Sequence, residues 1–427
     1  MKWVKTVLIS LIITVLGVSF SWADQKTPSI KSVQSIVRHQ GDNGQPQIIP
    51  SPPKIDAHAY VLMDADSGMI IAQKNMHHKL PPASLTKLMT LYLTSRAIKE
   101  GSINLDDEVN ISKKAWKTGG SRMFLRPNMK VSVRKLIKGV IVDSGNDATM
   151  ALAQYVGGSE DSFVNMMNQQ AQAIGMPNTH FVDPTGLPHD KHYSSAFDLA
   201  KLTRKIWLDF PKFHDWYDQK TFKFNGIKQN NRNRLLWHYP AALGMKTGHT
   251  QAAGYCLIGL AKKQNMTLIA VTMHAASDEA RSNDTQKLLE YGYRFFRNVK
   301  LYPSQAVVAQ PNVWYGESNQ VKAGPSQAID ITIGKQQFKN VQVKINTKNN
   351  LEAPIHKGDQ LGTLTVMLNN QKLSQYPIYA LNDVKKAGFL WRIWDGLSYY
   401  VTSWFSTSQA NQTKTINMGL DQTTLGS

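Results

Sequence analysis

The sequence predicts an α+β domain, in which an antiparallel sheet carries helices on its faces, followed by a small β-rich domain and a terminal amphipathic helix. Strand-like segments stand at both ends of residues 55–298, with several helical patterns between them, and this order favours one sheet covered by helices. Residues 299–384 then show short alternating runs broken by Gly, Asn and Pro, which are typical of a small all-β sandwich. A chain of 427 residues is also too long for one ordinary core.

The first 23 residues predict export. MKWVK is a short positive start, TVLISLIITVLGVSF is an apolar core, and Ser21 and Ala23 supply the small residues that a signal peptidase needs. A membrane-spanning helix would need a longer apolar run. We therefore expect a signal peptide over residues 1–23 and an exposed leader, rich in Gln, Ser, Pro and Asn, over residues 24–54.

Charge and cysteine content narrow the class of protein. The 49 Lys and Arg residues against 30 Asp and Glu residues suit membrane headgroups, an acidic polymer or nucleic acid. The sequence has no zinc-finger spacing, aromatic RNA-binding strand or dense basic helix, so we expect no nucleic-acid partner. Cys256 is the single cysteine, which excludes an internal disulfide, and its apolar neighbours predict a buried side chain.

Local patterns define the elements of the first domain. Residues 57–75 are typical of two strands around an Asp-Ser-Gly turn. Residues 83–101 carry apolar side chains at helical spacing and end at Gly101. The remaining patterns predict four helical segments, at residues 133–142, 147–157, 160–175 and 195–210. A stretch of strands follows at residues 241–275, and a final helix at residues 278–299.

Residues 385–406 predict an amphipathic helix, and residues 407–427 a polar tail. The helix would carry one apolar stripe, formed by Leu390, Ile393, Trp394, Leu397, Val401, Trp404 and Phe405. Two tryptophans with flanking lysines favour the surface of a bilayer, and the interrupting charges exclude a spanning helix. Docking of this helix on its own domain is the alternative.

The pattern Ser-x-x-Lys occurs three times, so its context must identify a reactive pair. Ser51–Lys54 lies in the leader, and Ser132 is better read as the N-cap of the next helix. Ser84–Lys87 opens a strongly apolar helix, where a spacing of three residues places the hydroxyl and the amine on one face. Ser84 is therefore the candidate nucleophile and Lys87 its candidate base.

A lysine base needs help from its surroundings. The ordinary pKa of about 10.4 leaves the amine protonated at neutral pH, and lowering it by about three units takes roughly 4 kcal/mol. A second ammonium about 4 Å away supplies roughly that amount at an effective dielectric constant near 20. We therefore expect another cation beside Lys87, and Lys246 in KTGHT is the candidate.

Two further motifs complete a specific set. DSGND supplies Ser144 and Asn146, a hydroxyl and an amide two positions apart, and KTGHT supplies Lys246, Thr247 and Gly248. A glycine on a strand allows a substrate backbone to approach closely. Each triplet alone is common. Together, in this order and about 60 and then 100 residues apart, they are a strong signal, and the set resembles the motifs of penicillin-binding proteins and class A β-lactamases.

With these motifs the chain resembles the low-molecular-weight penicillin-binding proteins, D-alanyl-D-alanine carboxypeptidases of the penicillin-binding protein 5/6 type. The likeness spans about residues 48–406 and includes AYVLMDADSG, NRNRLLW and KLLEYGYRFF. It implies a DD-peptidase-like, β-lactamase-like catalytic domain at 55–298, a β-rich stalk at 299–384, and a helix at 385–406 on the periplasmic face of the bacterial inner membrane. Ser-Gly-Asn as the middle motif, and the lack of Glu-x-x-Leu-Asn, argue against class A β-lactamases.

The resemblance also implies roles for these residues on peptidoglycan pentapeptide stems, and covalent inhibition by β-lactam antibiotics. Ser84 would attack the penultimate D-alanine with Lys87 as base, while Ser144 and Lys246 would relay protons. Binding roles fall to Asn146 for the substrate amide, to the backbone amides of Ser84 and His249 as oxyanion hole, and to Thr247 and Arg281 for the terminal carboxylate.

Several alternatives stay open at this point. Arg281 could instead pair with Asp278 or Glu279, and His249 could act through its backbone alone. The scaffold could also serve a β-lactam hydrolase, a DD-endopeptidase or a non-catalytic cell-wall anchor. Because no HExxH run occurs and the histidines at 189–192 are only a faint signal, we expect neither a metal nor a cofactor.

Overall fold

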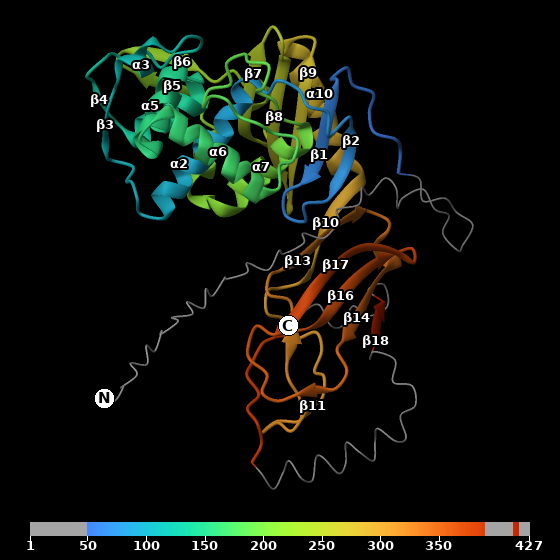
Figure 1. The fold of residues 1–427 in the computed structure, drawn as a ribbon. Helices are drawn as coiled ribbons and strands as arrows, with labels where there is room; N and C mark the ends of the chain where they lie inside the picture. The colour runs from blue at the N-terminus through green and yellow to red at the C-terminus, as the bar shows by residue number, and fades with distance from the viewer. Residues whose placement is uncertain (1–48, 389–412, 418–427) are drawn as a thin grey trace, which may run out of the picture.

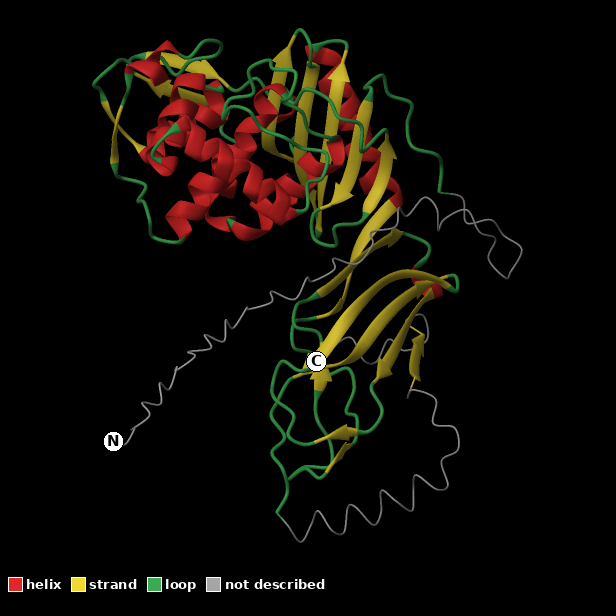
Figure 2. Ribbon diagram, in the orientation of Figure 1, coloured by secondary structure: helices red, strands yellow, loops and turns green. Residues whose placement is uncertain are grey.

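The structure, a computed structural model, describes residues 49–388 and 413–417 and has two lobes (Figure 1). The first lobe mixes helices and strands, and the second consists of strands joined by long loops, with a short helical turn (Figure 2). The predicted α+β domain followed by a β-rich domain is therefore confirmed. The signal peptide, most of the leader, most of the helix expected at 385–406 and most of the tail lie outside the described residues.

A five-stranded antiparallel sheet forms the centre of the first lobe. Its strand order is β2-β1-β9-β8-β7, with bounds Ile70–Lys74, Ala59–Asp64, Met266–Ala275, Gly254–Lys263 and Ala242–Thr250. β1 and β2 form the hairpin expected at residues 57–75, and Gly68 adopts a positive φ in its turn. The edge strand β7 carries the Lys-Thr-Gly motif, so one side of that motif is not covered by a neighbouring strand.

Alternating side chains bury the two faces of this sheet in two separate cores. Val61 and Met63 pack with the helical part of the lobe, whereas Leu62 packs with the long helix α10 (Asp278–Phe295). Successive residues of a strand point to opposite faces, which explains this division. The helical side contains α2 (Lys87–Lys99), α4 (Val133–Lys138), α5 (Asn146–Gly157), α6 (Glu160–Ile174) and α7 (Ala196–Asp209).

Serine caps fix where several of these helices begin. Ser132 accepts a hydrogen bond from the amide of Lys135 at the start of α4, as the sequence predicts. Ser159, Ser195 and Ser277 do the same for α6, α7 and α10. Each cap satisfies an amide that the helix itself leaves without a partner.

The second lobe contains a sheet in the order β12-β17-β16-β14-β18, with bounds Ala323–Gly324, Gln371–Ala380, Gln360–Leu368, Val341–Thr347 and Thr413–Asn417. β10 (Phe296–Tyr302) leaves α10 and pairs with β13 (Ile329–Gly334) at the junction of the lobes (Figure 1). β11 (Val313–Trp314) pairs in parallel with β15 (Leu351–Glu352). β18 falls in the stretch that the sequence analysis treats as a polar tail, and there the sequence predicts no strand.

Two small strand pairs complete the first lobe beside the site. β3 (Glu108–Asn110) pairs with β4 (Lys130–Ser132), and β5 (Thr221–Phe224) pairs with β6 (Ile227–Asn230). Short helices α3, α8 and α9 occupy Lys113–Lys117, His214–Tyr217 and Leu235–His238. No helix among the described residues is both long enough and apolar enough to cross a membrane.

Candidate active site

Ser84 and Lys87 lie at the junction of a short 3₁₀ turn and a helix. The turn covers Ala83–Thr86 and α2 begins at Lys87. The Lys87 Nζ donates to Ser84 Oγ at 2.7 Å and to the carbonyl oxygen of Thr185 at 2.9 Å. A serine hydroxyl within hydrogen-bond reach of a lysine amine is the arrangement that an activated nucleophile needs.

Burial brings the pKa of Lys87 close to neutral pH. The side chain is fully buried. Burial, together with the charge of Arg232, lowers the pKa of Lys87 to about 7, although Asp183 and Asp147 act in the opposite direction. The sequence analysis assigns this lowering to a second ammonium. That assignment is wrong in its main cause, because enclosure of the amine is the larger effect.

Lys246 approaches the site from β7 and contacts the second serine. Its Nζ donates to Ser144 Oγ at 2.9 Å and to the Thr247 carbonyl oxygen at 3.1 Å. Burial lowers the pKa of Lys246 well below its ordinary value, and the charge of Lys87 lowers it further. The charge of Lys87 therefore disfavours the protonated form of Lys246, whereas the cation that lowers the pKa of Lys87 is Arg232 and not the expected Lys246.

A strained turn presents Ser144. A π-helical turn, Gly139–Asp143, ends at Ser144, whose φ of 57° lies in the left-handed region. Residues other than glycine adopt this conformation uncommonly, because the Cβ atom is crowded by the backbone. The Gly145 amide donates to the Gly139 carbonyl at 3.1 Å and closes the turn. The chain then enters α5 with Asn146 as its first residue.

Asn146 has one side-chain atom available for a ligand. Its Nδ2 donates to the Gly119 carbonyl at 2.5 Å, while its buried Oδ1 has no hydrogen-bond partner among the described residues. A buried carbonyl oxygen without a partner is unfavourable, and a substrate N–H would satisfy it. The geometry therefore fits the amide-binding role that the resemblance implies.

Gly248 allows β7 to lie against the turn that carries Ser84. A Cβ atom at this position would stand 2.9 Å from the Pro82 carbonyl oxygen and 3.2 Å from the Ser84 amide nitrogen. The sequence analysis expects this glycine to make room for a substrate. Gly248 lines the cavity, and because a side chain here would crowd the turn that carries Ser84, the glycine also sets the spacing between that turn and β7.

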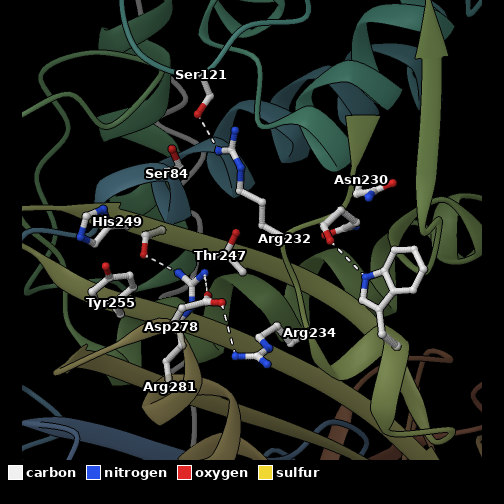
Figure 3. Close-up of a pocket in the computed structure, with 13 residues that line it drawn as sticks. Ser84, Ser121, Asn230, Arg232, Arg234, Thr247, His249, Tyr255, Asp278 and Arg281 are labelled. Carbon is white, nitrogen blue, oxygen red and sulfur yellow. Dashed lines mark hydrogen bonds and ion pairs between the residues drawn. The ribbon is translucent and has the colours of Figure 1, made fainter. Parts of the chain in front are cut away.

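A cavity of about 680 Å³ opens in front of Ser84 (Figure 3). It is lined by Ser84, Ser121, Asn230, Asn231, Arg232, Arg234, Trp237, Thr247, Gly248, His249, Tyr255, Asp278 and Arg281. Three of these residues are arginines and one is acidic, so the cavity suits an anionic group. Its size is within the usual range for small-molecule sites.

Arg281 makes the ion pair that is one of the two alternatives from the sequence, and it also lines the cavity. It forms an ion pair with Asp278, and its Nη1 donates to the carbonyl oxygens of Gly248 at 3.0 Å and Cys256 at 3.2 Å. It also lines the cavity, together with Thr247 (Figure 3). These contacts hold the guanidinium beside β7, where a carboxylate can reach it. Cys256 is buried, as expected.

His249 contributes a side chain as well as a backbone amide. Its ring stacks on Tyr255, with centroids 4.0 Å apart, and both rings line the cavity (Figure 3). The histidine side chain is exposed. The stacked pair forms one wall of the cavity.

Arg232 is a site residue that the sequence analysis does not single out. It comes from the loop between β6 and α9, lines the cavity, and donates through Nη1 to Ser121 Oγ at 2.6 Å (Figure 3). Its charge also lowers the pKa of both buried lysines. The available signal was NRNRLLW, which the sequence analysis uses for resemblance without assigning any role to its arginines.

A second unpredicted group holds the loop that accepts the hydrogen bond from Lys87. Asp183 Oδ1 accepts from the amides of Thr185 at 2.7 Å and Gly186 at 2.9 Å, and Asp183 Oδ2 pairs with His192 Nδ1 at 3.2 Å. His192 Nε2 lies 2.9 Å from Thr86 Oγ1. His192, which lies in the stretch 189–192 considered for a metal, therefore contacts the turn that carries Ser84. The described residues contain no group of three side chains placed to hold a metal.

Comparison with known protein families gives two matches along the chain. Residues 46–277 match the family described as D-alanyl-D-alanine carboxypeptidase. Residues 296–386 match the C-terminal domain of penicillin-binding protein 5. The first match contains Ser84, Lys87, Ser144 and Lys246, and the second covers most of the second lobe.

Individual relatives agree with these matches. D-alanyl-D-alanine carboxypeptidase DacC of Escherichia coli strain K12 is 41% identical over 363 residues, which cover 83% of this chain and 91% of that protein. The crystal structure of penicillin-binding protein 5 from Haemophilus influenzae is 40% identical, covers 79% of this chain and 100% of that chain, and gives a TM-score of 0.75. The chain thus belongs to the D-alanyl-D-alanine carboxypeptidase family, in the branch that carries a penicillin-binding protein 5 C-terminal domain.

Proposed function

We propose that the protein removes the terminal D-alanine from peptidoglycan pentapeptide stems through an acyl-enzyme on Ser84, and that penicillins acylate the same serine. One observation carries this proposal, namely the 2.7 Å hydrogen bond between Ser84 and a fully buried Lys87. Such a lysine accepts a proton near neutral pH, because its pKa is lowered to about 7.

The residues of the site divide the reaction between them. Neutral Lys87 takes the hydroxyl proton as Ser84 Oγ attacks the carbonyl carbon of the penultimate D-alanine. The amides of Ser84 and His249 stabilise the resulting oxyanion. Ser144 and Lys246 lie on the route by which a proton reaches the departing amine, so the terminal D-alanine leaves as a neutral amine. Water then attacks the ester, returns the serine proton and releases the shortened peptide.

Thr247, Arg281 and Asn146 would fix the substrate in this mechanism. The Arg281 guanidinium and the Thr247 hydroxyl take the terminal carboxylate in the cavity that Ser84 also lines. Asn146 Oδ1, which lacks a partner among the described residues, accepts the amide N–H of the residue that becomes the acyl group. This placement orients the scissile carbonyl toward Ser84, and such positioning can contribute several kcal/mol to catalysis.

The test measures free D-alanine released from a muramyl pentapeptide that ends in D-Ala-D-Ala. It compares the chain lacking residues 1–23 with Ser84→Ala and with Ser132→Ala, the same change in another Ser-x-x-Lys pair. We expect release by the parent and by Ser132→Ala, which loses only a helix cap of about 1 kcal/mol. Ser84→Ala should release none. Equal release by Ser84→Ala and the parent would contradict the proposal.

Three alternative functions of this scaffold can be distinguished by experiment. A β-lactam hydrolase would turn over a chromogenic cephalosporin rapidly, a DD-endopeptidase would cleave cross-linked dimers, and a cell-wall anchor would bind without cleaving. Complete reactive motifs argue against the anchor. The penicillin-binding protein 5 C-terminal domain favours the carboxypeptidase.

We further propose that the protein is exported, loses residues 1–23, and is held at the periplasmic face of the inner membrane by residues 385–406. The division into leader, catalytic domain, stalk and tail at 24–54, 55–298, 299–384 and 407–427 belongs to this proposal. Support comes from the apolar stripe flanked by lysines in the sequence. Residues 24–427 should sediment with anionic lipid vesicles and residues 24–384 should not. Equal sedimentation of both would contradict the anchor.

A further inference from the structure

Basic residues gather in two segments beside the cavity in front of Ser84. Residues 113–138 contain nine Lys and Arg residues, residues 219–238 contain five, and neither segment contains an acidic residue. The two segments are in contact in the fold, because Gln229 Nε2 donates to the Arg122 carbonyl oxygen at 2.9 Å and Asn225 Nδ2 donates to Met129 Sδ at 3.9 Å. The proposed mechanism gives most of these charges no role.

The hairpin of β5 and β6 places two lysines directly opposite each other. Lys223 pairs with Lys228 across the two strands, and both side chains are exposed. Like charges in this position destabilise a strand pair, and neither lysine forms an ion pair with a described residue. An anionic ligand that contacts both lysines would offset this repulsion.

The lysine face of the hairpin leads to the cavity. Side chains alternate along a strand, so Lys228 and Asn230 lie on one face of β6 and Gln229 lies on the other. Asn230 also lines the cavity (Figure 3). A ligand that covers the two lysines therefore lies beside the opening in front of Ser84. The material found there is the polymer to which the substrate stem is attached.

The loop beside the hairpin presents an aromatic ring to solvent. Phe124 has a φ of 66°, an uncommon conformation for a bulky residue, and is 47% exposed. The amides of its two neighbours, Met123 and Leu125, donate to the buried carboxylate of Asp147 at 2.8 and 3.0 Å. These bonds fix the backbone on both sides of Phe124. Its exposed ring suits the apolar C–H face of a sugar ring, and the exposed Arg126 follows two positions later.

The position of the hairpin favours the cell wall over the membrane as the partner. Charge alone suits either partner, because membrane headgroups and acidic polymers are both anionic. Figure 1 shows β5 and β6 on the side of the first lobe away from the second lobe, and the proposed membrane anchor follows the second lobe in the chain. A sugar polymer that carries carboxylates matches the lysines and the aromatic ring together.

We propose that Lys223, Lys228, Arg126 and Phe124 form a docking surface for the intact cell-wall polymer, separate from the cavity that holds the scissile peptide. The three cations contact carboxylates of stems other than the one being cut, and Phe124 stacks on a sugar ring of the glycan strand. The surface holds the enzyme on the wall between successive cuts. The identity of the polymer rests on the proposed function, whereas the binding itself needs no catalysis.

Sedimentation with purified, insoluble cell-wall sacculi tests the docking surface. Residues 24–427 are compared with the double variants Lys223→Gln/Lys228→Gln and Lys335→Gln/Lys339→Gln. The second is the matched control, since it removes the same charge from exposed lysines of the second lobe. Because exposed ion pairs contribute modestly, we expect roughly fivefold weaker binding by the hairpin variant and parental binding by the control. Conversion of the sacculus carboxylates to amides should weaken the parent to the level of the hairpin variant.

Phe124→Asn tests the sugar contact. Asparagine tolerates a positive φ, so the loop keeps its conformation while the ring is lost. We expect roughly threefold weaker binding to sacculi, and the loss should persist on amidated sacculi because it does not depend on charge. Parental binding by this variant would overturn the sugar contact.

Activity on small substrates separates the docking surface from the reaction. The hairpin variant should react with penicillin and release D-alanine from a soluble pentapeptide as the parent does, because neither lysine lines the cavity. Equal weakening of sacculus binding by both double variants would overturn the surface, since net charge alone would then explain it. A hairpin variant that loses binding to anionic vesicles and keeps binding to sacculi would overturn it in favour of a membrane contact. Failure of the folded parent to release D-alanine would overturn the proposed function, and sedimentation with sacculi would still decide whether the surface binds them.

Discussion

Burial distinguishes Lys87 from the other two lysines in Ser-x-x-Lys patterns. Lys54 and Lys135 are exposed, whereas Lys87 is fully buried and bonded to its serine. The same short pattern therefore yields a leader segment, a helix cap and a nucleophile. Sequence context points to Ser84 because an apolar helix follows it, and that helix is what draws the lysine out of water.

A pH profile tests this account of Lys87. Only the neutral amine accepts a proton, and its pKa is about 7, so the rate of acylation by penicillin should rise with pH through 7 and then level off. Lys87→Met should lose roughly 10²- to 10⁴-fold in that rate. Stopped-flow acylation between pH 5.5 and 8.5 measures both. A flat profile for the parent would contradict a lysine base.

The contacts around this pair were only partly predictable. Ser84, Lys87, Ser144 and Lys246 stand in short motifs, and the structure joins them as two hydrogen-bonded pairs, Lys87 with Ser84 and Lys246 with Ser144. Asp183 and His192 lie in no such motif. Their structural role depends on a loop that folds against Thr86, which is 106 positions from His192 in the sequence. Local sequence contains no sign of that contact.

At the level of elements, the site depends on close packing between a loop and the nucleophile turn. Gly186 has a φ of 85°, and a Cβ atom there would clash with the carbonyl oxygen of Ala83. Gly226, in the turn between β5 and β6, has a φ of 79° and no atom within 4 Å of such a Cβ. The two glycines share a backbone conformation and differ in their surroundings.

Gly186→Ala and Gly226→Ala should therefore differ in effect. Gly226→Ala should lower the free energy of unfolding by about 1 kcal/mol through backbone strain alone, with acylation unchanged. Gly186→Ala should lower it by a further 1–3 kcal/mol or so, because the turn must move. It should also slow acylation by up to roughly 100-fold. Denaturant unfolding and penicillin acylation give the readouts, and equal effects of the two changes would contradict the packing argument.

The π-helical turn before Ser144 contains a second testable group. Asp143 is buried, and neither carboxylate oxygen has a hydrogen-bond partner among the described residues. Burial, together with the charge of Asp147, raises the pKa of Asp143 to about 7, although Arg232 acts in the opposite direction. The folded protein therefore keeps a proton, between about pH 4 and 7, that the unfolded chain loses, so stability from this group falls as pH rises.

Asp143→Asn should remove that dependence. Relative to the parent, the variant should gain about 1–2 kcal/mol of unfolding free energy between pH 5 and pH 7.5. Asp183→Asn supplies a contrast of opposite sign. Burial alone would raise the pKa of Asp183, but bonds from His192 and Thr185 lower it to about 2, so its contribution is present above about pH 4 and is lost below. Thermal melts across pH measure the stability of each variant relative to the parent. If that relative stability changed with pH in the same direction for both variants, the argument would be refuted.

Element types were predictable where a long segment repeats its apolar residues at regular helical spacing, as in α2, α6, α7 and α10. The pairs β3–β4 and β5–β6 were not predicted, because strands of three or four residues have too little alternation to stand out. The pairing of β18 with β14 is a contact between segments distant in sequence. Such pairings follow from the folded core and not from local pattern.

At the scale of the whole molecule, one apolar cluster joins the two lobes. It includes Leu62 and Leu268 of the first sheet and also Ile331 and Val343 of the second lobe. Polar contacts cross the same junction, where Asn298 Nδ2 donates to Asp64 Oδ1 at 3.0 Å and the Ser67 and Thr332 hydroxyls lie 2.6 Å apart. The lobes therefore share part of their core, and each stabilises the other.

Removal of the second lobe should lower stability without removing the site. A chain ending at residue 298 exposes part of the shared cluster, so its Tm should fall by several degrees relative to a chain ending at residue 384. Its rate of penicillin acylation should stay the same, since all the residues of the cavity in front of Ser84 precede residue 298. Calorimetry would contradict this account if both chains melted at one temperature.

The most direct test of the central claim locates the covalent bond that the site forms. The chain lacking residues 1–23 is treated with penicillin, digested and mapped by mass spectrometry. We predict one adduct per chain, on Ser84, and none in the Lys87→Met variant over the same short time. An adduct on any other residue, or no adduct on a folded parent chain, would contradict the assignment of Ser84 as a nucleophile activated by a buried lysine.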